Sequence, residues 1–466
     1  MKKLLLTIVI LFSIIGIAYA SNVSTIEGTW NKRTPRIIKL FKVEDGTLKE
    51  IASTTLANDN KFYFGFAPDK EAFYVIGLSQ ATALNNYTFY FKPGDKLNVV
   101  INQDNTYNLI GNENTLENKE MERWHNFVFP LEDKAVYYAG KQSTYVDYFP
   151  LLDEKLESLG SYNQEYKGNS IFNENFKALQ KYDMLYYALQ FLSTPRMAHP
   201  QGEDFSDYYL NMDIADITSS SKLLEYPYGM GIISRYHMFI PSLKSDDYRE
   251  EQKKEFRNPQ SMLTITLPKI ANETIKGEVV LMQTRYIKSY EGFLDFEKKY
   301  GQYLVTDSQK DRFKGVVSKV ADNKKGQQAI DFKFPDINGK DIALSDFKGK
   351  VVYIDVWATW CAPCIKEIPE LKKLEEEYHG KDIVFLGVSI DRSKDKDKWK
   401  TFLEKREMKG IQIFAGDKAQ KELKDPYKIA TIPRFILVGK DGKLISGDAP
   451  RPSSTEIRLL LDSTLK

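Results

Sequence analysis

The sequence predicts a multidomain protein: an N-terminal antiparallel β-sandwich, a helical middle region and a C-terminal α/β domain. Three observations lead to this prediction. Residues 22–111 alternate apolar and polar side chains between frequent turn signals, which is typical of short antiparallel strands. Residues 112–322 space their apolar side chains three and four apart, as amphipathic helices do. Residues 329–466 alternate strand-like and helix-like segments, which favours a sheet with helices packed on it.

The first 20 residues have the pattern of an export signal. Lys2 and Lys3 precede an apolar run from Leu4 to Ile17, and Ala18-Tyr19-Ala20 offers small residues for cleavage. The run is shorter than the roughly 20 apolar residues of a membrane-spanning helix. We therefore expect a cleaved signal peptide over residues 1–20 and a periplasmic mature protein. An uncleaved N-terminal anchor is the alternative.

Aromatic residues are frequent in the predicted sandwich. Phe62, Phe64 and Phe66 alternate with other side chains, and Asp45-Gly46 and Pro93-Gly94-Asp95 mark turns. Seven or eight such strands predict two packed sheets. We expect the aromatic side chains to form the core rather than a sugar-binding groove, because most aromatic residues serve packing.

The middle region is predicted to be an irregular helical domain over residues 112–322. Its expected helices are 115–130, 143–160, a segment around residues 179–189, 259–285 and 306–321. His125, His199 and His237 have no cysteine or carboxylate beside them at metal-ligand spacing, so no metal site is expected. The formal net charge of +2 argues against a nucleic-acid partner.

The C-terminal domain begins after a polar linker at residues 322–328. Its predicted strands are 351–356, 383–389 and 434–438, and its predicted helices are 362–379, 395–407 and 417–428. A hairpin around Asp441-Gly442 and a helix from Ser453 complete it. This alternation predicts a sheet whose strands lead into helices.

Cys361 and Cys364 are the only two cysteines among 466 residues. They follow the apolar strand at 351–356 and fall at the first turn of a helix, where the positive end of the helix dipole favours an anion. Such a position lowers the pKa of a nucleophilic thiol from about 8.5 to roughly 3.5–7.5. Pro363 suits the helix start because it lacks an N–H. Zinc would need a second ligand pair, so the pattern predicts a dithiol/disulfide redox centre.

Two acids stand near this pair in the sequence. Asp355 lies six residues before Cys361 on the buried strand, and Glu367 lies three residues after Cys364 on the helix. A buried carboxylate near the resolving thiol can accept its proton, and burial raises the pKa of that carboxylate. A solvated helix charge is the alternative for Glu367, whereas an acid inside an apolar strand is costly without a function.

Late in the chain, Ile432-Pro433 comes immediately before the strand at 434–438. An Ile-Pro bond can be cis, and a cis turn would leave the Ile432 backbone free to pair with an extended substrate beside Cys361. An ordinary trans proline is the alternative.

These motifs resemble those of the TlpA/ResA-like disulfide reductases of the thioredoxin fold over residues 329–466. The family pattern Cys-x-x-Cys-x-x-Glu-x-Pro is matched by Cys361, Cys364, Glu367 and Pro369. The resemblance implies that Cys361 attacks, Cys364 resolves and Glu367 is the acid of the reductase branch. It also implies substrate-binding positions, which are Trp360, Ala362, Pro363, Ile432 and Pro433.

One position departs from that pattern. Asp355 occupies the buried-acid position of thioredoxin itself, where ResA-like members often carry a neutral residue, so either Asp355 or Glu367 could carry the proton. The β-rich region before residue 111 resembles an uncharacterised domain that precedes such modules in Gram-negative bacteria.

The resemblance and the residues together predict a periplasmic thiol-disulfide oxidoreductase that reduces disulfides of client proteins. The resemblance implies a link to cytochrome c maturation, re-reduction by a membrane thiol donor and no cofactor beyond the Cys361–Cys364 disulfide. Two alternatives remain: a disulfide isomerase, and an envelope- or glycan-binding protein with an accessory thioredoxin domain.

Overall fold

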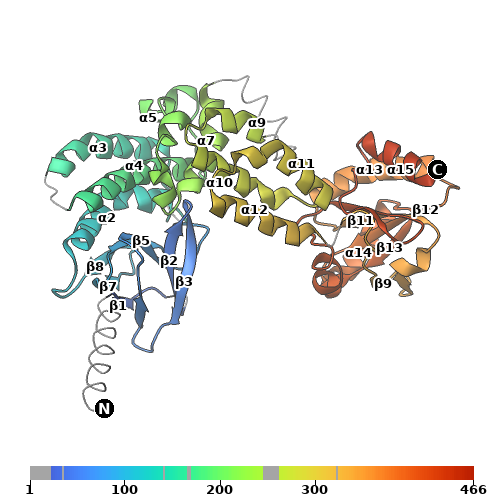
Figure 1. The fold of residues 1–466 in the computed structure, drawn as a ribbon, viewed down its shortest axis with the longest axis horizontal. Helices are drawn as coiled ribbons and strands as arrows, with labels where there is room; N and C mark the ends of the chain where they lie inside the picture. The colour runs from blue at the N-terminus through green and yellow to red at the C-terminus, as the bar shows by residue number, and fades with distance from the viewer. Residues whose placement is uncertain (1–21, 34–35, 140–141, 165–168, 245–261, 322–323) are drawn as a thin grey trace, which may run out of the picture. The chain divides into compact units, whose positions relative to one another are not determined.

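The computed structural model describes residues 22–33, 36–139, 142–164, 169–244, 262–321 and 324–466. Packing divides the chain into two compact units, Met1–Val279 and Val280–Lys466 (Figure 1). The predicted signal peptide at residues 1–20 lies outside the described residues. Within the described ranges, no helix combines the length and the apolar character needed to cross a membrane.

The N-terminal part of the first unit is a sandwich of two four-stranded sheets, with strand orders β4-β1-β7-β8 and β3-β2-β5-β6. Its strands are β1 (Ser24–Trp30), β2 (Ile37–Glu44), β3 (Thr47–Thr55), β4 (Lys61–Phe66), β5 (Ala72–Gly77), β6 (Tyr87–Phe91), β7 (Lys96–Ile101) and β8 (Tyr107–Leu109). Aromatic side chains from both sheets, such as Trp30 and Phe89, share one core. The predicted sandwich is confirmed. One pair differs from the predicted antiparallel arrangement: β7 comes after β6 of the opposite sheet, and it runs parallel to β1.

Helices follow the sandwich in the same unit, and the last of them continues into the second unit, which confirms a helical middle region. They are α2 (Leu116–Ala135), α3 (Tyr145–Gln164), α4 (Ser170–Leu192), α5 (Asp207–Leu210), α6 (Ile214–Ile217), α7 (Gly229–Lys244), α9 (Met262–Thr266) and α10 (Glu273–Gln283), with 3-10 turns at Gly202–Asp204, Ser221–Glu225 and Leu267–Lys269. The helix expected at 259–285 is thus interrupted in its described part. Pro268 lies at the interruption, and the backbone at Ile270 is extended.

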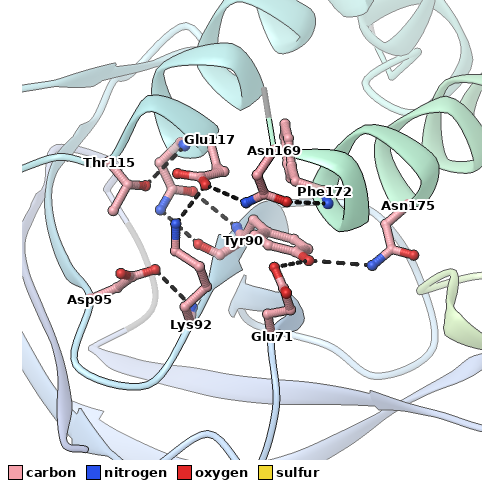
Figure 2. Close-up of polar contacts among 10 residues, drawn as sticks. Glu71, Tyr90, Lys92, Asp95, Thr115, Glu117, Asn169, Phe172 and Asn175 are labelled. Carbon is pink, nitrogen blue, oxygen red and sulfur yellow. Dashed lines mark hydrogen bonds and ion pairs between the residues drawn. The ribbon is translucent and has the colours of Figure 1, made fainter. Parts of the chain in front are cut away.

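A network of hydrogen bonds and ion pairs joins the sandwich to α2 and α4 (Figure 2). Asn118 of α2 binds the backbone of Tyr90 on the edge strand β6. The Tyr90 N–H donates to Asn118 Oδ1 at 2.9 Å, and Asn118 Nδ2 donates to the Tyr90 carbonyl at 2.8 Å. The neighbouring Glu117 accepts hydrogen bonds from Lys92 Nζ at 2.5 Å and Asn169 Nδ2 at 2.9 Å. The Asn118 carboxamide therefore takes the place of a further strand at this edge of the sheet.

The second unit starts with helices that precede the α/β domain. These are a 3-10 turn at Thr284–Tyr286, α11 (Tyr290–Tyr300), a 3-10 turn at Gly301–Tyr303 and α12 (Asp307–Val320). The sequence predicts a domain boundary near residue 322, whereas packing divides the chain after Val279. The two boundaries differ in part because Arg434 of the α/β domain binds the backbone carbonyl of Lys288, which lies before residue 322.

The α/β domain is a five-stranded sheet of order β13-β12-β11-β14-β15, accompanied by a hairpin of β9 and β10. Its elements are β9 (Lys333–Pro335), β10 (Asp341–Ala343), β11 (Val351–Trp357), α13 (Ala362–Glu377), β12 (Ile383–Ser389), α14 (Lys396–Lys405), β13 (Ile411–Phe414), β14 (Arg434–Val438), β15 (Leu444–Ser446) and α15 (Glu456–Leu465), with 3-10 turns at Leu344–Phe347 and Ser393–Asp395. Helices α13 and α15 pack on one face through a core that includes Leu374 and Leu461 (Figure 1). This arrangement confirms the predicted thioredoxin-like domain.

One predicted helix of this domain differs. Residues 417–428 form a 3-10 turn at Gly416–Lys418 and a π-helical turn, η10, at Gln420–Lys424. Pro426 follows two residues later, and a proline disfavours helical conformation at the residue before it. The segment therefore ends before a regular helix forms.

The Asn118 contacts predict a large effect on stability. Asn118→Ala leaves the Tyr90 N–H and carbonyl buried without partners, which should lower the free energy of unfolding by about 3 kcal/mol. Differential scanning calorimetry of the full chain measures this as a lower transition temperature. Asn108→Ala is the matched control, because Asn108 is exposed on the same sandwich. Equal transition temperatures for the two variants would contradict the role given to Asn118.

Candidate redox site

The site is built at the end of the central strand of the sheet. All seven residues of β11 are buried, and β11 pairs in parallel with β12 and antiparallel with β14. The strand is rich in β-branched and aromatic residues, which suit a strand covered on both faces. Immediately after it, the Cys361 N–H donates to the Ala358 carbonyl at 3.0 Å, and α13 begins at Ala362. The chain therefore turns from the sheet into the helix at the two cysteines.

Cys361 and Cys364 form a disulfide. Cys361 is the N-cap residue of α13, and the Cys364 N–H donates to Cys361 Sγ at 3.2 Å. Pro363 lies in the first turn, where its missing N–H costs nothing. Both sulfur-bearing side chains are buried, while Ala362 and Pro363 are exposed and the Trp360 side chain is 60% exposed. An apolar, accessible rim thus surrounds the disulfide.

The peptide bond between Ile432 and Pro433 is cis. Ile432 packs against the cluster of buried side chains that contains Cys361 and Cys364. Pro433 directly precedes β14, the antiparallel neighbour of β11. The structure therefore places Ile432 against the cysteine cluster, while Trp360, Ala362 and Pro363 adjoin the cysteines in the chain and Pro433 follows Ile432.

Asp355 lies inside β11, with 5% of its surface exposed. Its Oδ1 has no hydrogen-bond partner among the residues that the structure describes. Burial, together with the negative charges of Glu367 and Glu375 on α13, raises the pKa of Asp355 to about 8. Near neutral pH the side chain is therefore mostly a neutral carboxylic acid.

Glu367 is buried as well, but its oxygens are occupied. Oε2 accepts from the Ser453 N–H at 3.0 Å, and Oε1 accepts from the Ser453 hydroxyl at 3.0 Å. Arg451 Nη1 lies 3.7 Å from Oε1. Glu367 therefore fastens the loop before α15 to the helix that carries the cysteines.

Asp391 is a site residue that the sequence did not reveal. Its carboxylate accepts from the Thr359 hydroxyl at 2.7 Å, from the Thr359 N–H at 3.0 Å and from the Ser389 hydroxyl at 2.8 Å. These bonds fix the backbone two residues before Cys361. An acid directly after the predicted strand 383–389 was the available signal.

Arg434, directly after Pro433, is the second such residue and is only 1% exposed. Its Nη1 donates to the carbonyls of Lys288 and Gly447 at 2.8 and 2.9 Å, and its Nε lies 3.6 Å from Asp448 Oδ1. Burial lowers the pKa of Arg434, and the Asp448 carboxylate opposes this shift. A charged residue at the start of an apolar strand was the signal that sequence reasoning overlooked.

Metal chemistry has no visible support in the described part of the chain. There, no group of three or more His, Cys, Asp or Glu side chains is placed to hold a metal ion. The chemistry that the arrangement can perform is the opening and closing of the Cys361–Cys364 bond, with a proton held nearby on Asp355.

Comparisons with known proteins place similarity in the same region. Residues 324–457 match the Redoxin family. The thiol-disulfide oxidoreductase ResA of Bacillus cereus (strain ATCC 10987 / NRS 248) is 34% identical over 134 residues, which make up 28% of this chain and 74% of that protein. A crystal structure of a candidate thiol-disulfide oxidoreductase from Bacteroides vulgatus is 48% identical, covers 30% of this chain and 96% of its own, and has a TM-score of 0.28. The thioredoxin domain of a thiol-disulfide oxidoreductase from the same organism is 28% identical, with coverage of 30% and 98% and a TM-score of 0.28.

The buried Asp355 predicts a pH-dependent stability. In the unfolded chain an aspartate has a pKa of about 3.9, whereas in the folded chain burial raises the pKa of Asp355 to about 8. Between these values the folded state binds more protons than the unfolded state, so the free energy of unfolding falls as pH rises. Asp355→Asn removes this loss and should stabilise the oxidised protein by a few kcal/mol more at about pH 8 than at about pH 5. Calorimetry at both pH values measures the difference, and an equal gain at both would argue against the raised pKa.

Proposed function

This chain belongs to the family of ResA-like thiol-disulfide oxidoreductases, and we propose that it reduces disulfides of client proteins outside the cytoplasm. The observation that carries the proposal is the Cys361–Cys364 disulfide at the start of α13, with the exposed Trp360 directly before it in the chain and Ile432 packed against its cluster. In the reduced form, the Cys364 N–H and the helix dipole would stabilise a thiolate on Cys361. Cys361 is therefore the proposed attacking thiol.

The proposed reaction transfers two electrons to the client. The Cys361 thiolate attacks a client disulfide, which forms a mixed disulfide and releases one client thiolate. Cys364 then loses its proton to a nearby carboxylate, and its thiolate attacks Cys361 Sγ. The Cys361–Cys364 bond forms, the second client thiolate leaves, and the client is reduced as the dithiol is oxidised. A membrane thiol donor reverses these steps on the protein and restores the dithiol.

Asp355 is the proposed proton carrier of this step. An acid whose oxygen is unpartnered among the described residues, and whose pKa is about 8, can both accept and return a proton near neutral pH. Glu367 holds hydrogen bonds from Ser453 on both oxygens, so a transfer to it would weaken those bonds. These contacts favour Asp355 as the carrier and a positioning role for Glu367.

The location and the client are also proposals. The charged start, apolar run and small residues of positions 1–20 support export with cleavage after Ala20. Kinship with the ResA proteins makes apocytochrome c, with its paired haem-site cysteines, one candidate client. A reductase also requires a low reduction potential. A potential close to that of DsbA, about −120 mV, would contradict the proposed reductase activity.

Trapping tests the roles of the two cysteines. With a chromogenic aryl disulfide, the reduced wild-type chain should release two coloured thiolates in two phases, one for attack and one for resolution. Cys364→Ser should release only one and remain as a mixed disulfide on Cys361, while Cys361→Ser should release far less. In periplasmic extract the Cys364→Ser variant should capture client proteins. Equal release by both variants, or no second phase in the wild type, would contradict the assignment.

The second phase also separates the two acids. Asp355→Asn should slow it by roughly tenfold or more and remove its pH dependence near pH 8, since no base then takes the Cys364 proton. Glu367→Gln should keep a fast second phase but move its pH dependence to lower pH, because a negative charge beside Asp355 is lost, and should lower the thermal transition because the Ser453 contacts weaken. Stopped-flow absorbance across pH measures both effects. The reverse pattern would assign the proton to Glu367.

A further inference from the structure

Asp355 stands in a row of residues that crosses the sheet. Register pairs Asp355 with Phe435 on β14 and with Gly387 on β12, and it pairs Gly387 with Gln412 on β13. Paired side chains point to the same face of a sheet. That face is the one covered by α13, because Tyr353, two residues earlier on β11, packs in the core shared with this helix.

Gly387 leaves room in this row, and the Gln412 side chain occupies it. A Cβ atom on Gly387 would lie 2.1 Å from Gln412 Oε1, so only glycine permits this arrangement. Neighbouring strands are about 4.8 Å apart, and the Gln412 carboxamide therefore extends over β12 toward the Asp355 side chain. Gln412 Nε2 donates to the Lys409 carbonyl at 3.2 Å.

The same row contains two buried side-chain oxygens. Gln412 Oε1 and Asp355 Oδ1 both lack a hydrogen-bond partner within the described residues, and both side chains are more than nine-tenths buried. When Asp355 is ionised, its carboxylate oxygen and the Gln412 amide oxygen are both acceptors. A single water molecule can donate one hydrogen bond to each, which would satisfy both.

Glu375 of α13 lies against the turn that precedes β13. A Cβ atom on Gly410 would lie 2.8 Å from Glu375 Oε1, so the carboxylate rests against the Lys409–Gly410 turn that also binds Gln412. Glu375 lines a pocket of about 600 Å³ together with this turn. Burial raises the pKa of Glu375 to about 7, with Lys409 and Lys372 opposing the shift. An acid that exchanges protons near neutral pH therefore stands between the buried row and the solvent.

We infer that Asp355 exchanges its proton with solvent through Glu375, across a water molecule that the Gln412 carboxamide holds. The proton moves from Cys364 Sγ to the Asp355 carboxylate, then through the water held by Gln412 to Glu375, and from Glu375 into the open pocket. The opposite sequence supplies the proton when the disulfide opens. This inference rests on the proposed function, because it requires Asp355 to serve the dithiol.

Of the titratable groups around Asp355, Glu375 is the one best suited to exchange a proton with it. From α13, Glu367 and Glu375 act on it, and Glu367 is bound by Ser453. On β11 the titratable neighbour is Tyr353, whose pKa burial raises far above the neutral range. The paired positions on β12 and β14 are Gly387 and Phe435, which carry no charge.

The test compares the full chain with three variants in the second thiolate-release phase. With little change in shape, Glu375→Gln removes the titratable group of this route and Gln412→Met removes the amide that holds the water. Glu376→Gln is the matched control, because Glu376 is exposed on the same helix and pairs with Lys409 Nζ at 3.1 Å. In weak buffer, the first two variants should slow the phase by roughly five- to tenfold, and added imidazole should restore it by carrying protons. Glu376→Gln should match the wild type.

Two results would overturn the inference: unchanged rates in Glu375→Gln and Gln412→Met, or slowed rates that imidazole does not restore. The proposed function fails separately, when the wild type itself releases no second thiolate. In that event, the NMR titration of the Asp355 carboxyl in the oxidised chain still applies. Glu375→Gln should lower its midpoint, since a neighbouring negative charge is lost, and Glu376→Gln should not. An unchanged midpoint would contradict the link between Glu375 and Asp355.

Discussion

A carboxyl group inside the central strand is the constraint on which the C-terminal unit depends. Burying Asp355 among apolar residues is costly unless the group stays neutral, and burial raises its pKa to about 8. The register of β11 decides where this group lies, because a slip of one residue would move Asp355 to the other face of the sheet. The same register carries the chain to Cys361, six residues further on. The depth of the acid and the position of the dithiol are therefore set together.

Two acids of similar chemistry acquire different roles from their surroundings. Glu367 receives two hydrogen bonds from Ser453 and fastens a loop. Asp355 has an oxygen without a partner among the described residues and lies beside two negative charges. Where the surroundings of two titratable groups give them different pKa values, the two groups commonly have different acid–base roles. The sequence alone left open which of the two acids carries the proton, and their partners distinguish them.

Local pattern was sufficient for much of the fold. The strand 351–356, the helix after it and the cysteines at its first turn follow from apolar alternation, spacing and proline chemistry. The contacts that complete the site join residues far apart in sequence, such as Glu367 with Ser453 and Asp391 with Thr359, and no local pattern encodes them. The same reason applies to the unit boundary, since the tie between Arg434 and Lys288 spans 146 positions. The helix predicted at 417–428 was wrong for a local reason. The apolar spacing of this segment suggests a helix, but Pro426 interrupts the helical backbone.

Arg434 connects the segment before α11 to the strand beside the redox site. Its planar guanidinium carries several donors in fixed directions, so one side chain can hold two carbonyls and face a carboxylate. It uses them on Lys288, just before α11, on Gly447 and on Asp448. The loop that continues from Asp448 carries Ser453, which binds Glu367 on the cysteine helix. Through Lys288, residues 284–320 are therefore anchored at the strand that follows Pro433, and they belong to the same compact unit as the α/β domain.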